Sequence, residues 1–167
     1  MTDPAALEIL KNALLLERRG QAFYAKVAEQ ASSPAVKDFF GLMADEEGRH
    51  IDALSDQYRA YLRQGAFLEL DTPDGASAGF ATSVLSDRLR REISAADFEA
   101  AAIGAAMMME RDAVRLYGDR ARATADPDER ALYEWLATWE AGHLEFLARV
   151  EREVTESVWN DNRFWPM

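Results

Sequence analysis

The chain has 167 residues, of which 49% are hydrophobic and 29% charged, the composition of a folded globular protein. Its formal net charge of −11 argues against a nucleic-acid partner and against an anionic membrane surface, since both require a basic face. The absence of cysteine excludes disulfides, thiolate metal sites and thiol catalysis.

Neither the N-terminus nor the rest of the sequence predicts a targeting or spanning segment. Residues 1–4 lack the basic and apolar regions of a signal peptide, and no apolar run approaches the ~18 residues that cross a bilayer. We therefore expect a soluble, cytoplasmic protein that forms one domain over residues 1–167.

Helix start signals and helical spacing of apolar residues predict an all-α fold with helices at about 4–31, 34–64, 94–123 and 127–156. Three of these helices begin with an N-cap side chain followed by proline: Asp3-Pro4, Ser33-Pro34 and Asp126-Pro127. Before the remaining helix, Ser94 and Asp97 have the spacing of a capping box.

The first two helices each carry an apolar stripe that is interrupted by polar residues near its middle. Glu17 lies within the stripe of the first helix, and Glu47 and His50 lie within that of the second. A charged side chain on an inward face is costly unless something compensates its charge, so these positions predict a site inside the bundle.

The segment at 65–93 contains glycine and proline turn signals, and residues 80–92 are compatible with a short helix. A connection of this length can cross a helical bundle, whereas an up-down-up-down bundle needs only a short loop there. We therefore expect a long crossover that leaves the second and third long helices parallel.

The last two helices repeat the polar interruption, with Glu110 in one and Glu140 and His143 in the other. The run Met107-Met108-Met109 is interpreted as core and helix-packing material. The aromatic stretch from Trp159 to the end has no regular period, and we expect it to dock on the bundle or on a partner subunit.

The two halves of the chain resemble each other at a gapless offset of 93 residues, so that residues 4–64 and 94–156 form two similar helical hairpins. The matching pairs are Glu17 with Glu110, Tyr24 with Tyr117, Pro34 with Pro127, Glu47 with Glu140, and His50 with His143. Both histidines of the chain thus follow a glutamate by three residues and another by 33.

Residues three apart share a helix face, so each Glu-x-x-His pair can converge on one ion. A single such pair more often marks a solvated face, and a lone inward histidine is more often a satisfied core residue. Four inward carboxylates together would repel one another, although protonation or mutual hydrogen bonds relieve part of this cost. Two divalent cations neutralise four carboxylates fully, which favours a two-metal site.

With this motif the chain resembles the ferritin-like carboxylate proteins, and among them the rubrerythrin branch. The resemblance implies that Glu17 and Glu110 are terminal ligands, one to each metal. It also implies bridging ligands at Glu47 and Glu140, and one histidine on each metal, His50 and His143. Tyr24 and Tyr117 are expected either to hydrogen-bond ligand carboxylates or simply to pack in the core.

Two departures from rubrerythrins proper affect the expected function. The chain has no cysteines for a rubredoxin module, so its electron donor would be external, and Ala113 stands where rubrerythrins carry an additional glutamate. Both weaken a peroxidase assignment without affecting the metal site, and the set of four glutamates and two histidines is closer to bacterioferritin-type centres.

The resemblance implies a di-iron protein that reacts with hydrogen peroxide or dioxygen in oxidative-stress defence. The aromatic residues near the C-terminus lead us to expect a homodimer. The alternatives are a ferroxidase or iron-storage module, a structural bundle with a redox-silent metal such as zinc, and a specialised oxygenase. The donor set itself does not choose iron over manganese.

Overall fold

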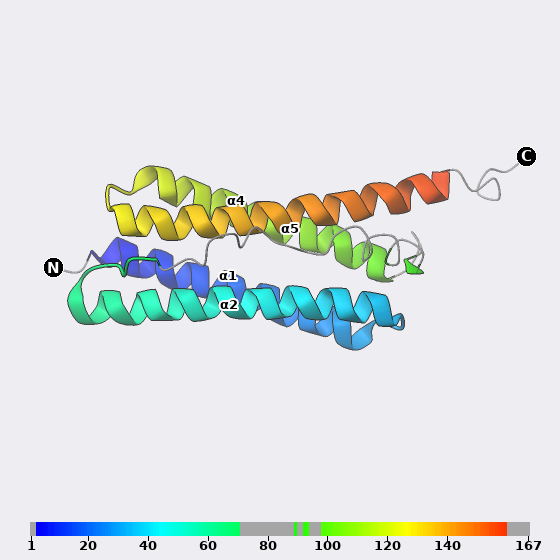
Figure 1. Ribbon diagram of the computed structural model, residues 1–167, viewed down its shortest axis with the longest axis horizontal. Coiled ribbons are helices and arrows are strands. Elements are labelled where there is room, and N and C mark those ends of the chain that lie inside the picture. Colours follow the sequence, from blue (N-terminus) through cyan, green and yellow to red (C-terminus); the bar gives the residue numbers. More distant parts are fainter. Residues whose placement is uncertain (1–2, 71–88, 90–91, 94–97, 160–167) are drawn as a thin grey trace, which may run out of the picture.

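The computed structural model describes residues 3–70, 89, 92–93 and 98–159, with the side chains of 157 and 158 excepted. Four long helices make up this part of the chain: α1 (Pro4–Gln30), α2 (Pro34–Gln64), α4 (Phe98–Ala123) and α5 (Pro127–Trp159). The predicted all-α ferritin-like bundle is confirmed, because α1 pairs with α2 and α4 with α5 as two packed hairpins (Figure 1).

The helix starts follow from local capping. Asp3 accepts a hydrogen bond from the backbone N–H of Ala5, and Ser33 accepts one from that of Val36. At the start of α5, Asp126 accepts from the backbone N–H groups of Asp128 and Glu129 at 2.9 and 3.1 Å. These bonds satisfy N–H groups that the first helical turn leaves without partners.

The chain leaves α2 at a glycine and turns back along the bundle. Gly65 has φ 68°, a left-handed conformation that glycine adopts without steric cost, and its N–H bonds to the carbonyl of Tyr61. Gln57 then fixes the returning chain with two hydrogen bonds to the backbone of Leu68, at 2.8 and 3.0 Å.

Helices α2 and α4 run in the same direction, as the predicted crossover requires, since α2 ends at the end of the bundle opposite to the one where α4 begins (Figure 1). The proposed capping box at Ser94 and Asp97, most of the possible short helix at 80–92, and the aromatic tail beyond Trp159 lie outside the described residues. In the described part, α5 continues to Trp159, three residues beyond the expected end.

Two apolar clusters fill the bundle, one towards each end. One contains Phe39, Phe40 and Val150 among its members, and the other contains Leu10, Leu54 and Leu136. Between them lies a set of buried acidic and imidazole side chains, so the predicted pattern of apolar ends and a polar middle is confirmed. None of the described helices is both long and apolar enough to cross a membrane.

Candidate metal centre

Six polar side chains from all four helices meet in the middle of the bundle. Each is at most 3% exposed, and they are the six that the sequence singled out: Glu17, Glu47, His50, Glu110, Glu140 and His143. They form two overlapping groups, in each of which one potential ligand atom per residue lies within 4.8 Å of the others.

The two groups share two carboxylates. One group contains Glu17, Glu47, His50 and Glu140, and the other contains Glu47, Glu110, Glu140 and His143. Glu47 and Glu140 therefore lie between the groups, where a carboxylate can bridge two ions, while Glu17 and Glu110 each belong to one group.

Both imidazoles turn the same ring nitrogen towards the carboxylates. The Nδ1 atom of His50 lies 2.9 Å from Glu140 Oε1 and 3.1 Å from Glu17 Oε2. The Nδ1 atom of His143 lies 3.2 Å from Glu140 Oε2 and 3.6 Å from Glu110 Oε1. Each histidine can thus offer Nδ1 to an ion held among these oxygens.

Two tyrosines fix the carboxylates that belong to one group each. Tyr24 on α1 donates a hydrogen bond to Glu110 on α4, and Tyr117 on α4 donates one to Glu17 on α1. Both tyrosines are fully buried, so core packing fixes their positions as well. The structure thus contains the hydrogen bonds that the resemblance implied, and each of them links one hairpin to the other.

Protons compensate the acidic cluster only in part. Burial and the nearby charge of Glu140 raise the pKa of Glu110 from 4.5 to about 8. Burial alone would lower the pKa of His143, but hydrogen bonds to Glu110 and Glu140 outweigh it and raise the pKa from 6.5 to about 9. The pKa of Glu47 is raised mainly by burial and by its hydrogen bond with Glu17.

Glu140 stays ionised. Burial would raise its pKa, but hydrogen bonds from His143 and His50 outweigh this and lower the pKa below its ordinary value of 4.5. A metal ion binds the deprotonated forms of these carboxylates and imidazoles, so ions and protons compete for the cluster.

The donor set fits two divalent ions. Four carboxylates and two neutral imidazoles balance the charge of two M²⁺ ions, and oxygen with imidazole nitrogen suits iron, manganese or zinc. The six residues are the ones that would hold these ions, and the assignment of individual ligand roles to them remains a prediction.

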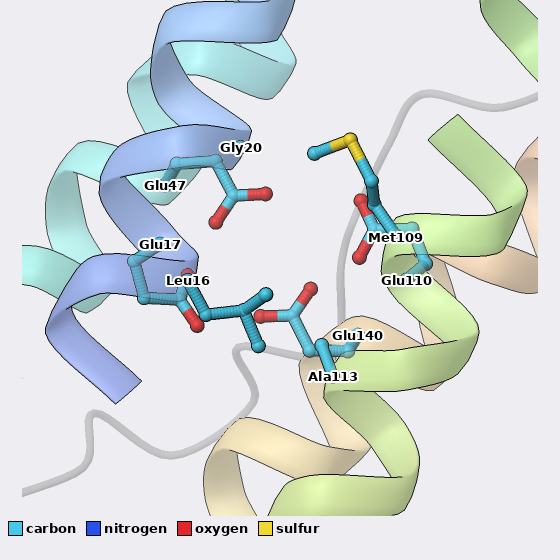
Figure 2. Close-up of a pocket in the computed structure, with 8 residues that line it drawn as sticks. All are labelled: Leu16, Glu17, Gly20, Glu47, Met109, Glu110, Ala113 and Glu140. Carbon is cyan, nitrogen blue, oxygen red and sulfur yellow. The ribbon is translucent and has the colours of Figure 1, made fainter. Parts of the chain in front are cut away.

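A pocket opens onto the carboxylates from the side of α1 and α4. Its lining consists of four pairs of repeat-related residues: Leu16 and Met109, Glu17 and Glu110, Gly20 and Ala113, and Glu47 and Glu140 (Figure 2). About 230 Å³ of space lies among these residues, a figure that includes open solvent.

Gly20 makes room for a carboxylate of the cluster. A Cβ atom at this position would lie 3.3 Å from both Cδ and Oε1 of Glu47, closer than an ordinary van der Waals contact. The absence of a side chain three residues after Glu17, on the same helix face, is the sequence signal for this role.

Aromatic rings cover the histidine side of the centre. The rings of Trp135 and Trp139 pack edge-on against His50, with centroids 5.4 and 5.7 Å away, and Trp139 lies 6.2 Å from His143. Sequence reasoning gave these tryptophans no part. Their spacing, four residues apart and one to five residues before the Glu140-x-x-His143 motif, was the available signal.

The structure corrects the interpretation of the methionine run as core and helix-packing material. Met107 packs against the core as expected, but Met108 is 66% exposed and Met109 lines the pocket. Three successive helical residues point in directions about 100° apart, so a run of one residue type cannot lie wholly in the core.

Comparison with known proteins now decides the family. The rubrerythrin family model matches residues 8–151. The chain belongs to the rubrerythrin family. Searches of curated proteins and of solved structures found no significant match. Among rubrerythrin-like chains, this one has no cysteine with which to bind iron through thiolates, and its buried Glu/His cluster is compatible with a di-iron site.

Proposed function

We propose that this protein holds two iron ions and reduces hydrogen peroxide with electrons from an external donor. The observation that carries the proposal is the pair of overlapping ligand groups that share Glu47 and Glu140. The residues of these two groups would hold two ions, and a pair of redox-active ions would supply the two electrons that cleavage of the O–O bond consumes.

The overall reaction is H₂O₂ + 2e⁻ + 2H⁺ → 2H₂O. The protein contributes position and charge, because the ligand carboxylates are fixed by tyrosine hydrogen bonds before the substrate arrives. Burial and the adjacent glutamates raise the pKa of both Tyr24 and Tyr117, so their hydroxyl groups stay protonated and continue to donate.

The pocket favours a small oxidant over an organic substrate. Leu16 and Met109 line the pocket and are partly exposed, so they form its mouth, whereas the carboxylates in its lining are buried (Figure 2). On the opposite side, Trp135 and Trp139 pack over His50. Small molecules therefore reach the centre between α1 and α4.

A ferroxidase is the second candidate, and Ala113 favours it. Its buried side chain lines the pocket and offers no carboxylate, so the ligand set is four glutamates and two histidines. In that case Fe²⁺ is the substrate and dioxygen the oxidant, and the acidic surface of the chain attracts the cation.

The test loads metal-free protein with Fe²⁺ without oxygen and measures the iron bound per chain. Dioxygen and peroxide are then added to separate samples while the visible absorption of ferric iron is recorded. Two irons per chain and faster oxidation by peroxide support the peroxidase. Faster oxidation by dioxygen, with continued uptake of iron, supports the ferroxidase. Bound iron that reacts with neither oxidant contradicts both and leaves a structural, redox-silent site.

A matched variant shows whether the response comes from this centre. Glu46 adjoins Glu47 on α2 but is absent from both ligand groups. We expect Glu46→Ala to bind two irons and Glu47→Ala to lose them. Equal iron oxidation by both variants would place the reaction elsewhere in the molecule.

A further inference from the structure

Met108 and Met109 are neighbours in sequence but have different surroundings. Met108 is 66% exposed on α4, whereas Met109 is partly buried and lines the pocket above the carboxylates (Figure 2). Across the pocket, the repeat places Leu16 opposite Met109, and a leucine side chain has no atom that peroxide oxidises readily. Among the described residues that line the pocket, Met109 alone carries an oxidisable thioether.

We propose that Met109 is a modification site, at which peroxide that enters the pocket of the iron-loaded protein converts the thioether to a sulfoxide. This inference rests on the proposed function, which brings peroxide to the centre. It differs from that function in its product, because the oxygen atom is retained on the protein and not released as water.

The step balances without a further reactant. A lone pair on Sδ attacks one oxygen of H₂O₂, an S–O bond forms and the O–O bond breaks. The departing hydroxide takes the proton from the oxygen now bound to sulfur and leaves as water. Sulfur loses two electrons and peroxide gains them, so the sum is R–S–CH₃ + H₂O₂ → R–S(O)–CH₃ + H₂O.

Geometry distinguishes this oxidation from ordinary damage. Oxidation by peroxide in bulk solvent follows exposure, so Met108 should react before Met109. Peroxide that is reduced at the iron-loaded centre has to enter the pocket, where Met109 lines the space beside the carboxylates. The order in which the two methionines are oxidised thus shows where the peroxide reacts.

The product changes the pocket. A sulfoxide is polar, and its oxygen accepts hydrogen bonds, so oxidation replaces an apolar group at the mouth with a hydrophilic one. Methionine sulfoxide reductases restore the thioether, which makes the modification reversible.

The experiment compares iron-loaded with metal-free protein after a limited dose of H₂O₂, with unbound iron removed beforehand by gel filtration. Mass spectrometry measures the added oxygen at each methionine, and fragment ions that separate residues 108 and 109 assign it. We expect the ratio of Met109 sulfoxide to Met108 sulfoxide to rise about tenfold with iron. In the metal-free protein, oxidation should follow solvent exposure, so Met108 should be oxidised more than Met109.

Two substitutions sharpen the test. Met109→Leu makes the pocket mouth leucine on both sides and should abolish the iron-dependent oxygen addition, while Met108→Leu should leave it at Met109. Leu16→Met should create a second iron-dependent sulfoxide, at position 16, because the repeat places that side chain at the same mouth. Two bound irons per chain show that each variant has folded with its centre intact.

Absorption recorded on the same samples separates the inference from the function on which it rests. Ferric absorption without an iron-dependent rise in the ratio of Met109 sulfoxide to Met108 sulfoxide overturns the inference alone. If peroxide produces no ferric absorption, the proposed function fails and the inference fails with it.

Discussion

The turn between α1 and α2 and the turn between α4 and α5 occupy equivalent positions, but different chemistry holds them together. At the first turn, Val27, Ala31 and Val36 pack in an apolar cluster. At the second, their repeat counterparts are Arg120, Thr124 and Glu129.

There the guanidinium of Arg120 donates two hydrogen bonds to Glu129, at 2.7 and 2.8 Å, and the hydroxyl of Thr124 donates a third. One backbone geometry thus accommodates either an apolar or an ionic contact.

The middle of each hairpin shows the opposite behaviour. The acidic, imidazole and phenol side chains are the same in both halves, and all of them contact the candidate centre. A hairpin end needs only some contact that fills its volume and satisfies its polar groups. The centre needs specific donor atoms at specific positions. We therefore expect substitutions at the centre to weaken or abolish metal binding, and substitutions at the turns to change the unfolding free energy only moderately.

The largest expected effect is loss of metal from variants of the shared carboxylates. Glu47→Ala and Glu140→Ala each remove a residue common to both ligand groups, so we expect neither variant to hold two metals per chain. Glu17→Ala and Glu110→Ala remove a residue of one group only and should retain one metal. Metal analysis after gel filtration gives the stoichiometry, and circular dichroism checks that helical content is unchanged.

Retention of two metals by Glu47→Ala or Glu140→Ala would contradict the ligand assignment. Loss of both metals from all four variants would show that the shared and unshared carboxylates do not differ.

The next effect separates the two turns. Glu129→Ala leaves the guanidinium of Arg120, which is 18% exposed, without its carboxylate, and should cost about 2–3 kcal/mol of unfolding free energy. Replacing the whole network by its counterparts, as Arg120→Val with Thr124→Ala and Glu129→Val, should change stability by less than about 1 kcal/mol. Urea unfolding of metal-free protein measures the unfolding free energy of the single and the triple variant. An equal loss of stability in the two variants would refute the equivalence of the turns.

In the metal-free protein, the middle should respond to pH. A pKa that is raised in the folded state means that folding favours the protonated form, so the stabilisation is complete below the ordinary pKa and is lost as pH rises through the folded one. For Glu110 that window runs from 4.5 to about 8, and for His143 from 6.5 to about 9. The lowered pKa of Glu140 affects stability only below its ordinary value of 4.5, outside these windows.

We therefore expect the melting temperature of metal-free protein to fall as pH rises from about 5 to about 9. With metal the trend should weaken or reverse, because metal binds the deprotonated ligands. Thermal scans with and without chelator test this. A metal-free melting temperature that rises with pH would contradict the assigned protonation.

The smallest effect concerns the two small residues of the pocket. Gly20→Ala pushes against Glu47 and should weaken metal binding by about tenfold, the lower end of what altered support of a ligand costs. Ala113→Gly, at the repeat-related position, should cost about 1 kcal/mol of helix stability without weakening the metal. Calorimetric titration compares the metal affinities of the two variants. Equal affinities would show that Glu47 can move away from the added methyl group without cost.

Sequence alone predicted the helices and the cluster because both depend on local rules. Capping residues define helix starts, and spacings of three and four residues bring Glu47 and His50 to one face. The directions of neighbouring side chains were less accessible, as the different surroundings of Met108 and Met109 show. A rotation of the helix by about 100° would carry one of these side chains to the direction of the other, and only packing between helices fixes that rotation.

The contacts of Trp135 and Trp139 with His50 were missed for a related reason. They join α5 to α2, and a pattern within one helix does not say which ring of another helix it meets. The close approach of Glu47 to Gly20 likewise joins two helices and depends on their separation.

Each hairpin gives three members to one ligand group and a single member to the other. Two identical hairpins related by a twofold axis would therefore suffice to build a centre of this kind, and its two positions would then be indistinguishable. Carrying both hairpins on one polypeptide removes that constraint. Each half can change independently, as leucine faces methionine and glycine faces alanine across the pocket, so the two ligand groups need not be equivalent.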